Sequence, residues 1–594
     1  MEALPINQQN IFLLRKKNVW YSMCDGNWSN PNTWLSNALD RKNITLPQAG
    51  DDVYINHNVT MDLAAITINN LYVSGSLTTV SSPGVTLTVN GDCQVSGSGL
   101  ISLPSNFHNI VLNGYNNIIP YAGFNAGSYS TVTYNASVYN QPILNLPYHN
   151  LTTQNGKKYQ TGDVTVGGTF TPYSNYECGA YNLTVNGSST IGNLGVSTFS
   201  KNSSTGSILF VGAVDFEGNV DLTVGNPNVE FRGGFTLHSF NVNFGTGTTS
   251  FTTNNQTITC SYFNQIWYSS IIIQGAITVT LSGGATFQTN STINGALSGS
   301  TFNNSGVLLL GNSTAPMSTG VFNYQHTSTS TLGYVFNGAL TIPNATYANL
   351  VIGGTGSKTL GANTVIGKSF TNNGVFDTNG HNLTVTTTFT NAGNFTANVF
   401  SSLLLIGYAE MASGGSVGFD VSTGNPNIEF RGGWDVHSAS PVKTGTGTYS
   451  FTTNNQTVSF SAYLNGASAA NFLVSGAITV TFTSGGTIPN FTGTLNGDNA
   501  SSIFDCRGTF MYQNATAPMV TGKLYCNQAT NTFVYGLGGN QDITVPSDST
   551  PCYQNLTLQG SGAKTLLGNV SVKGVYTLTS PATLNSNGFA LTNP

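Results

Sequence analysis

One ten-residue segment occurs twice in this chain, with a separation of about 200 residues. The first copy is residues 225–234 (GNPNVEFRGG) and the second is residues 424–433 (GNPNIEFRGG). Further paired segments follow both copies in the same order: SFTTNNQT at 250–257 and 450–457, GAITVT at 275–280 and 476–481, and TAPM at 314–317 and 516–519. Because the repeat is long and contains several strand-like runs, it predicts an array of strands that grows along one axis.

A second motif, of the form Tyr-x-Asn-Leu, occurs three times and sets the boundaries of the repeats. Its copies begin at Tyr148, Tyr347 and Tyr553, and each is followed by a turn that contains Gly and Lys. We therefore expect an amino-terminal arm with a tryptophan-rich cap, a first β-helix segment, two full repeats and a truncated third copy at the tip. Their predicted bounds are 1–45, 46–147, 148–346, 347–552 and 553–594.

Apolar and polar residues alternate from Asp52 onward, in short runs separated by Gly, Asn, Ser and Pro. This pattern is typical of β-strands joined by turns, and no sustained helical pattern interrupts it. The runs recur roughly every 16–24 residues, which is close to one turn of a parallel β-solenoid. The predicted fold is therefore all-β, a long parallel β-helix built from the two repeats and the truncated third. Tandem β-sandwiches, two in each repeat, remain the alternative.

Charged residues make up only 7% of the 594 residues, whereas 39% are apolar, so the chain has ample material for a core. The 17 basic residues are scattered, and Arg15-Lys16-Lys17 is the only basic triple. Because nucleic-acid binding needs a basic face, we expect no nucleic-acid partner. No run of apolar residues is long enough to span a bilayer, so we expect no membrane insertion. We expect no cofactor either.

The seven cysteines form no metal-type or redox spacing. They are Cys24, Cys93, Cys178, Cys260, Cys506, Cys526 and Cys552. We interpret them as buried or incidental thiols of a protein made in a reducing compartment. The short apolar stretch 11–14 precedes its basic cluster, which is the wrong order for a secretory signal. The sequence therefore favours a protein that stays in the producing cell until it is released.

The amino-terminal region contains three of the five tryptophans, Trp20, Trp28 and Trp34. Residues 26–34 (GNWSNPNTW) and 46–55 (LPQAGDDVYI) together resemble the opening of bacterial surface β-helix adhesins and G8-type modules, over roughly residues 24–100. The resemblance implies that the tryptophans cap the first coil and that the Pro-x-x-Gly-Asp turn launches the first strands. Asp51 and Asp52 could bind calcium, but the sequence offers no further oxygen ligands at suitable spacing. The favoured interpretation is therefore that the two residues form the turn.

Glu230 and Arg232 lie two residues apart in the duplicated segment, as do Glu429 and Arg431. Residues at this spacing share one face of a strand, so each pair can form an ion pair. One interpretation is a polar ligand site; the favoured one is a structural ion pair that closes the turn before Gly-Gly. His238 and His437 also recur, but neither has a second ligand nearby, and we predict no metal site.

Glycoside hydrolysis would need two carboxylates about 5–9.5 Å apart. The candidates are Asp215, Glu217, Asp221 and Glu230 in the first repeat, and Glu410, Asp420 and Glu429 in the second. At the matching places the second repeat has Glu410 and Asp420 in a rearranged pattern, and of the glutamates only Glu429 is kept. The sequence therefore predicts no catalytic residues and a protein that is not an enzyme.

An aromatic amino-terminal end, a polar β-repeat body and low charge together resemble phage tail fibres, head fibres and tailspikes. The resemblance implies a virion protein made in the host cytoplasm, a homo-oligomer (most simply a trimer), and a receptor that is a host surface glycan or protein. It also implies contact with other virion proteins through the amino-terminal region, where Arg15, Trp20, Trp28 and Trp34 are the candidate attachment residues. The sequence does not identify the receptor-binding residues. A bacterial surface adhesin of the same fold and a tailspike polysaccharide depolymerase remain alternatives.

Overall fold

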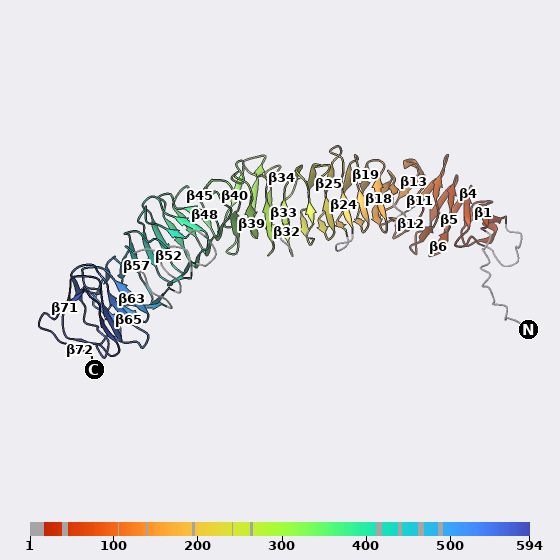
Figure 1. Ribbon diagram of the computed structural model, residues 1–594. Helices are drawn as coiled ribbons and strands as arrows, with labels where there is room; N and C mark the ends of the chain where they lie inside the picture. The colour runs from red at the N-terminus through yellow and green to blue at the C-terminus, as the bar shows by residue number, and fades with distance from the viewer. Residues whose placement is uncertain are drawn as a thin grey trace, which may run out of the picture. The chain divides into compact units, whose positions relative to one another are not determined.

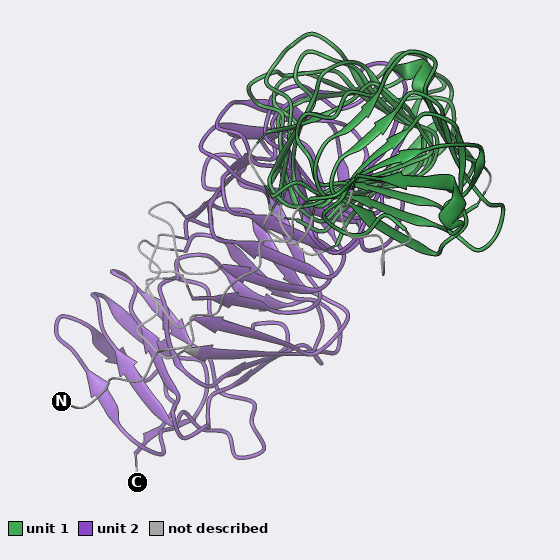
Figure 2. Cartoon of the chain, turned by 90° about the vertical axis from the view of Figure 1, so that its right-hand side faces the viewer, with its two compact units in different colours: residues 1–280, 293–301 green, residues 281–292, 302–594 purple. Residues whose placement is uncertain are grey.

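The structure is a computed structural model, and it describes residues 17–37, 46–104, 106–137, 140–192, 197–239, 241–261, 265–411, 418–437, 442–460, 468–484 and 491–593. These residues are 48% strand and 1% helix, and they form a parallel β-solenoid of about 23 turns (Figure 1). The predicted all-β solenoid is therefore confirmed. The chain divides into two compact units, residues 1–280 with 293–301 and residues 281–292 with 302–594 (Figure 2).

A typical turn of the solenoid consists of three short strands, and each of them pairs in parallel with its counterpart in the next turn. The first coil also contains one antiparallel pair, Val19–Ser22 with Trp34–Ser36. One turn comprises β17 (Asn150–Thr153), β18 (Lys157–Gln160) and β19 (Val164–Val166), and the next comprises β20 (Phe170–Pro172), β21 (Asn175–Glu177) and β22 (Leu183–Val185). Parallel pairing between successive turns is incompatible with antiparallel β-sandwiches, so that alternative is wrong.

Three faces run along unit 1, and the candidate site lies on one of them. This face is an eight-stranded sheet: β16 (Pro147–Tyr148), β19, β22, β25 (Ile208–Phe210), β28 (Val229–Phe231), β31 (Thr248–Phe251), β34 (Ser270–Ile273) and β37 (Ile293–Gly295). A six-stranded sheet forms the second face: β15 (Gln141–Ile143), β18, β21, β24 (Thr198–Ser200), β27 (Asn219–Asp221) and β30 (Val242–Asn243). The third face includes β26 (Val214–Phe216), β29 (Phe235–Leu237) and β32 (Gln256–Cys260).

Unit 2 has the same arrangement. Its eight-stranded sheet is β43 (Thr346–Tyr347), β46 (Thr364–Ile366), β49 (Leu383–Val385), β52 (Ser402–Leu405), β55 (Asn427–Phe430), β57 (Thr448–Phe451), β59 (Asn471–Val474) and β61 (Leu495–Gly497). The neighbouring faces include β42 (Leu340–Ile342), β45 (Ser357–Leu360), β48 (Val375–Asp377), β53 (Tyr408–Met411), β56 (Trp434–Val436) and β58 (Gln456–Phe460).

Strand alternation sends one residue into the core and the next outward. On the eight-stranded sheet of unit 1, the inward row includes Leu183, Ile208 and Val229, all buried. Burial of an aliphatic side chain contributes roughly 1.5–3 kcal/mol, so the stacked rows supply the main stabilisation of each turn. Outside the core, side chains of one type form ladders: the amide of Asn113 donates to Asn90 (2.9 Å), and the amide of Asn135 donates to Asn113 (2.9 Å). The many asparagines thus bond successive turns to one another.

The tripled tyrosine motif marks the same place in three turns. Tyr148, Tyr347 and Tyr553 are buried, and each hydroxyl donates to a carbonyl oxygen a few residues earlier in the chain, at 2.6–2.7 Å. The hydroxyls of Tyr148 and Tyr553 also bond a second buried tyrosine at 2.8 Å. The motif therefore provides partners for polar groups in the core, and its recurrence follows from the repeated turn.

Three buried lysines follow these tyrosines, and the sequence indicated them only as parts of turns. Lys158, Lys358 and Lys564 are 0% exposed. Their ammonium groups donate to backbone carbonyls of neighbouring turns: Lys158 to Ala136 and Asn155; Lys358 to Phe336, Gly338 and Gly356 at 2.8–2.9 Å; Lys564 to Leu537 and Gly539 at 2.6 and 3.0 Å. Burial lowers the pKa of Lys158 to about 8. Each lysine thus satisfies carbonyl groups at a corner of the solenoid.

The three amino-terminal tryptophans belong to the core of the first coil. Trp20 donates from Nε1 to Asp51 Oδ2 (2.9 Å), and Trp34 donates to the Trp28 carbonyl (2.9 Å) and packs edge-on against the Trp28 ring. All three side chains are less than 10% exposed. They therefore cap the coil, as the resemblance implied. The prediction that they provide an exposed attachment interface is wrong, because their surfaces are already buried.

Asp51 belongs to the turn that precedes β4 (Asp52–Ile55). Its buried carboxylate also accepts a hydrogen bond from the Gln48 amide (2.9 Å), so the Pro-x-x-Gly-Asp turn and the cap are one unit. This geometry supports the turn interpretation of Asp51-Asp52. The fourth candidate attachment residue, Arg15, lies outside the described residues.

Candidate functional site

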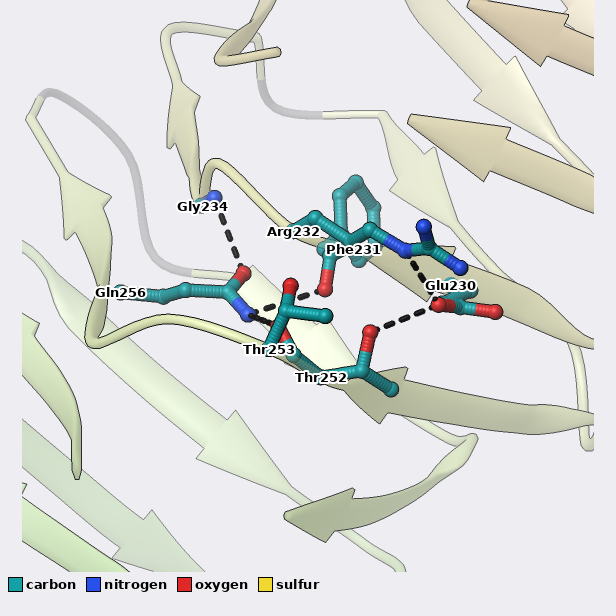
Figure 3. Close-up of polar contacts among 7 residues, drawn as sticks. All are labelled: Glu230, Phe231, Arg232, Gly234, Thr252, Thr253 and Gln256. Carbon is teal, nitrogen blue, oxygen red and sulfur yellow. Dashed lines mark hydrogen bonds and ion pairs between the residues drawn. The ribbon is translucent and has the colours of Figure 1, made fainter. Parts of the chain in front are cut away.

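Glu230 lies at the centre of β28 and points outward, and the predicted ion pair with Arg232 is present (Figure 3). Arg232 Nε donates to Glu230 Oε1 at 2.7 Å, and Thr252 Oγ1 on the next turn donates to the same oxygen at 2.6 Å. About a third of each charged side chain is exposed. One carboxylate oxygen, Oε1, therefore receives both protein donors.

Gln256 fixes the turn behind this pair (Figure 3). Its buried amide nitrogen donates to the carbonyls of Phe231 (2.9 Å) and Thr252 (2.8 Å), and its oxygen accepts from the Gly234 amide (3.0 Å). The side chain thus provides partners for three backbone groups that the corner would otherwise leave unpaired, which a buried site tolerates poorly.

The Gly-Gly pair of the motif is required by the same corner. A Cβ on Gly233 would lie 2.5 Å from the carbonyl carbon of Gly212 in the preceding turn. Gly234 has φ of +73°, and a Cβ there would lie 2.4 Å from the Thr257 carbonyl oxygen. Both positions therefore exclude larger residues for backbone reasons.

The second copy repeats this arrangement in unit 2. Arg431 Nε and Thr452 Oγ1 each donate to Glu429 Oε1 at 2.7 Å. Gln456 bonds the carbonyls of Phe430 and Thr452 and the Gly433 amide at 2.7–3.2 Å. The duplicated sequence therefore encodes one hydrogen-bonded turn, used twice.

The carboxylates of both copies are held in the charged form. Partial desolvation is the largest single effect on Glu230 and raises its pKa, but the hydrogen bonds from Thr252 and Arg232 and the arginine charge together lower it below its ordinary value. The pKa of Glu429 is lowered in the same way by Arg431 and Thr452. A lowered pKa suits a fixed ion pair and does not suit a proton donor at neutral pH.

The other candidate carboxylates of the first repeat lie on different faces. Asp215 on β26 contacts His238 Nδ1 at 2.7 Å, and Asp221 accepts from the Thr223 amide and hydroxyl. Glu217 follows β26. The structure therefore does not gather Asp215, Asp221 and Glu230 into one site.

The second repeat brings two carboxylates onto neighbouring strands, one of which the sequence did not indicate. Glu410 on β53 is the register partner of Asp435 on β56. Asp435 Oδ2 receives the Tyr408 hydroxyl (2.5 Å) and His437 Nε2 (2.7 Å). The first repeat has Thr236 where the second has Asp435, so comparing the repeats could not reveal this pair. Asp420 instead pairs with Lys443 at 2.7 Å.

A hollow of about 420 Å³ lies beside Glu230 on the eight-stranded sheet of unit 1. Its lining is mainly polar: Asp163, Val164, Thr165, Asn182, Thr184, Ser207, Ile208, Leu209, Asn228, Val229, Glu230 and Ser250. Asp163 precedes β19, three strand spacings from Glu230, which places the two carboxylates roughly 14 Å apart or more. This separation exceeds the range for two-carboxylate glycoside hydrolysis.

A second hollow of about 270 Å³ adjoins the first, because Thr165 lines both. Its lining is Tyr121, Ala126, Asn145, Leu146, Pro147, Tyr148, His149, Thr165 and Gly167. Because the two hollows share Thr165, they are together called the groove of unit 1 below, and the smaller hollow contains the rings of Tyr121, Tyr148 and His149.

Within the described ranges, no group of three or more His, Cys, Asp or Glu side chains could hold a metal ion, and no helix is both long and apolar enough to cross a membrane. The seven cysteines are free, and all except Cys24 are buried. Burial raises the pKa of Cys93 to about 12, which keeps that thiol protonated.

No model of a known protein family, no curated protein and no solved structure matches this chain.

Proposed function

We propose that this chain is a structural fibre protein of a bacteriophage virion, which attaches the particle to the host cell surface. The observation that supports this proposal best is the use of the duplicated segment. Both copies bind their charged groups to one another and to the backbone, as expected of a repeat retained to build a scaffold. The outward faces are left to asparagine, threonine and serine, whose amides and hydroxyls suit the recognition of a host surface glycan or protein.

The proposal includes assembly into a parallel homo-oligomer, with a trimer as the first choice. Large apolar side chains at corners of the solenoid support it, because side-by-side packing would cover them. Val224 in unit 1 is 72% exposed, and Phe400 in unit 2 is 62% exposed. Sedimentation velocity of the purified chain tests this part, and a monomer at micromolar concentration contradicts it.

The amino-terminal region is proposed as the end that joins other virion proteins. A deletion that tests this must end before β1 (Val19–Ser22), because Trp20 belongs to the core. We expect a chain without residues 2–16 to fold and to be absent from purified particles. Mass spectrometry of particles assembled with the full-length or the shortened chain gives the answer, and thermal unfolding of the shortened chain controls for folding.

Equal incorporation of the folded, shortened chain would place the attachment end elsewhere. Absence of the full-length chain from particles, together with its presence on the surface of bacterial cells, would replace the virion proposal by the adhesin alternative.

Polysaccharide cleavage is the second candidate function, and the Glu410–Asp435 pair favours it. The backbones of register partners on adjacent parallel strands lie about 4.8 Å apart, so these two side chains leave the sheet from neighbouring positions, as a pair of catalytic carboxylates must. Release of reducing ends from host capsule, lost in both Glu410→Gln and Asp435→Asn but retained in Glu429→Gln, would move this function to first place. We expect no release.

A further inference from the structure

Three ring side chains contact one another along one corner of unit 1, and together they are called the aromatic stack below. The rings of Phe107 and Tyr129 are tilted by 36° with centroids 5.4 Å apart, and the rings of Tyr129 and His149 meet edge-on with centroids 5.7 Å apart. Phe107 is 77% exposed and Tyr129 is 57% exposed. Tyr129 also has φ of +71°, a conformation that a bulky residue rarely adopts. A strained backbone that holds an exposed ring in a stack is a common feature of functional sites.

His149 connects this stack to the polar groove. It lines the smaller hollow together with Tyr121, which is 61% exposed. The imidazole lies close against Gly168: a Cβ there would be 2.8 Å from His149 Nε2. The position of the ring therefore depends on the absence of a side chain at residue 168.

The second repeat lacks this arrangement although its scaffold is the same. Ala348 stands where the first repeat has His149, and Lys368 stands where it has Gly168. The second repeat builds the same turn without a ring at the position of His149, so the His149 ring is not needed for the turn and calls for another explanation.

We propose that the aromatic stack and the adjoining groove of unit 1 bind a neutral oligosaccharide strand. Sugar rings present apolar C–H faces that pack on aromatic rings, and their hydroxyls bond amides, hydroxyls and carboxylates. The stack supplies Phe107 and Tyr129, His149 belongs to both the stack and the smaller hollow, and the larger hollow supplies Thr184, Asn228 and Glu230. Only one oxygen of Glu230 is used by Arg232 and Thr252, so the other can accept from a sugar hydroxyl.

The charge of the groove excludes anionic ligands. Its lining includes Asp163 and Glu230 and neither lysine nor arginine. A phosphate, sulfate or carboxylate would therefore be repelled. This inference rests on the proposed attachment function and names the substrate class that the fibre would recognise.

The test uses the full-length chain and a panel of neutral hexasaccharides of glucose, galactose, mannose and N-acetylglucosamine, in both linkage configurations. Isothermal titration measures affinity, and saturation-transfer NMR identifies the sugar protons that contact the protein. We expect at least one oligosaccharide to bind, and we expect saturation to pass from the aromatic side chains of the protein to the protons of that sugar. Tyr129→Ala should weaken this binding about three- to tenfold, the loss expected for one stacked ring.

Gly168→Ala provides an independent variant that removes no ring, because its Cβ would lie 2.8 Å from His149 Nε2 and 2.5 Å from Asn150 Oδ1, so both side chains must shift. Tyr115→Ala is the matched control, since Tyr115 is an exposed tyrosine of unit 1 outside the lining of both hollows. Glu230→Gln should weaken binding, whereas Glu429→Gln, the same change in the second copy, should not. Circular dichroism and thermal unfolding establish that each variant is folded.

Three results would overturn the proposal: no probe bound at millimolar concentration, equal affinity in Tyr129→Ala, Gly168→Ala and the parent chain, or preference for sulfated or sialylated probes. A change in sedimentation caused by Tyr129→Ala would also overturn it, because the stack would then be an interface between copies of this chain. Particle incorporation is measured separately, so loss of glycan binding and loss of the attachment function are distinguishable.

Discussion

Behind Glu230, the core of unit 1 is filled by Phe235, Phe244 and Trp267, whose rings stack at centroid distances of 4.2–6.4 Å. Behind Glu429 in unit 2, Trp434, Tyr449 and Phe472 fill the core at 5.8–6.4 Å. Phe235 and Trp434 occupy matching positions, but the other rings do not.

At two positions where one unit has a ring in its core, the other unit has a small hydroxyl residue. In unit 1, Thr249 and Ser269 form a buried hydroxyl pair at 2.7 Å, whereas the position of Thr249 in unit 2 is Tyr449. In unit 2 the hydroxyl pair is Thr444 with Ser468 at 3.0 Å, and the first of these matches Phe244.

The two cores therefore place their large side chains at different positions, whereas the turn in front of each core keeps the same hydrogen bonds. A close-packed interior must conserve volume, but many combinations of side chains satisfy that condition. By contrast, few side chains can provide hydrogen-bond partners for all three backbone groups of the corner. This difference explains why the sequence identity of the repeats is concentrated in the turn.

The largest expected effect comes from removing a core ring. Trp267→Ala should destabilise unit 1 locally by about 3–5 kcal/mol, because it leaves a cavity beside Phe235 and Phe244. Trp267→Phe, which keeps most of the volume, should cost clearly less. Hydrogen exchange of the amides in β32 and β34 measures the local effect, which suits a repeat protein that need not unfold in two states.

Trp434→Ala should cost a similar amount in β56 and β58, although Trp434 and Trp267 do not occupy matching positions. A loss below about 1 kcal/mol in either variant would mean that the core relaxes into the cavity.

The buried glutamines should give the next largest effect, and the same one in both copies. Gln256→Ala and Gln456→Ala each leave two carbonyls and one amide without their partner, at a cost of about 1–3 kcal/mol. The measurement is hydrogen exchange of the backbone amides of Gly234 and Gly433, which donate to the side-chain oxygens of Gln256 and Gln456. Unequal losses in the two copies would show that the core behind the turn contributes to its stability.

The buried lysines should have a smaller, pH-dependent effect. Because the pKa of Lys158 is lowered to about 8 from an ordinary value of about 10.4, the unfolded chain binds more protons between these pH values. The contribution of Lys158 to stability should therefore rise as the pH increases from about 8 to about 10.4. Lys158→Met should cost about 1–2 kcal/mol at pH 7, because it leaves buried carbonyls unpaired, and its difference from the parent chain should grow over this pH range.

Denaturant unfolding of the parent chain and of Lys158→Met at pH 7 and pH 10 checks this prediction. Lys157→Met is the neighbouring control, which removes a partly exposed lysine that pairs with Glu177. A Lys158→Met variant that differs from the parent chain by the same free energy at both pH values would contradict the prediction.

The sequence predicts the fold well because alternation and turn residues report directly on strands and corners. It also predicts the pairing of Glu230 with Arg232, which needs only the two-residue period of a strand. It could not predict Lys158, whose ammonium binds carbonyls of a neighbouring turn, or Asp435, whose partners depend on the register between turns. The burial of Trp20 likewise depends on Asp51, which is distant in the sequence and adjacent only after folding.

The ion pairs should give the smallest effect. Because the folded pKa of Glu230 and of Glu429 is lowered, their stabilisation is present above the unfolded value of about 4.3 and is lost as the pH falls through the folded value. Each pair is about one-third exposed, so its contribution is only about 0.2–1 kcal/mol. Glu230→Gln and Glu429→Gln should therefore lower stability slightly at pH 7 and converge with the parent chain near pH 3. Urea unfolding at both pH values measures this, and 1 M salt should reduce the difference. A larger loss for Glu230→Gln than for Glu429→Gln would mean that the two copies, identical in their hydrogen bonds, differ in the flexibility of the turn behind them.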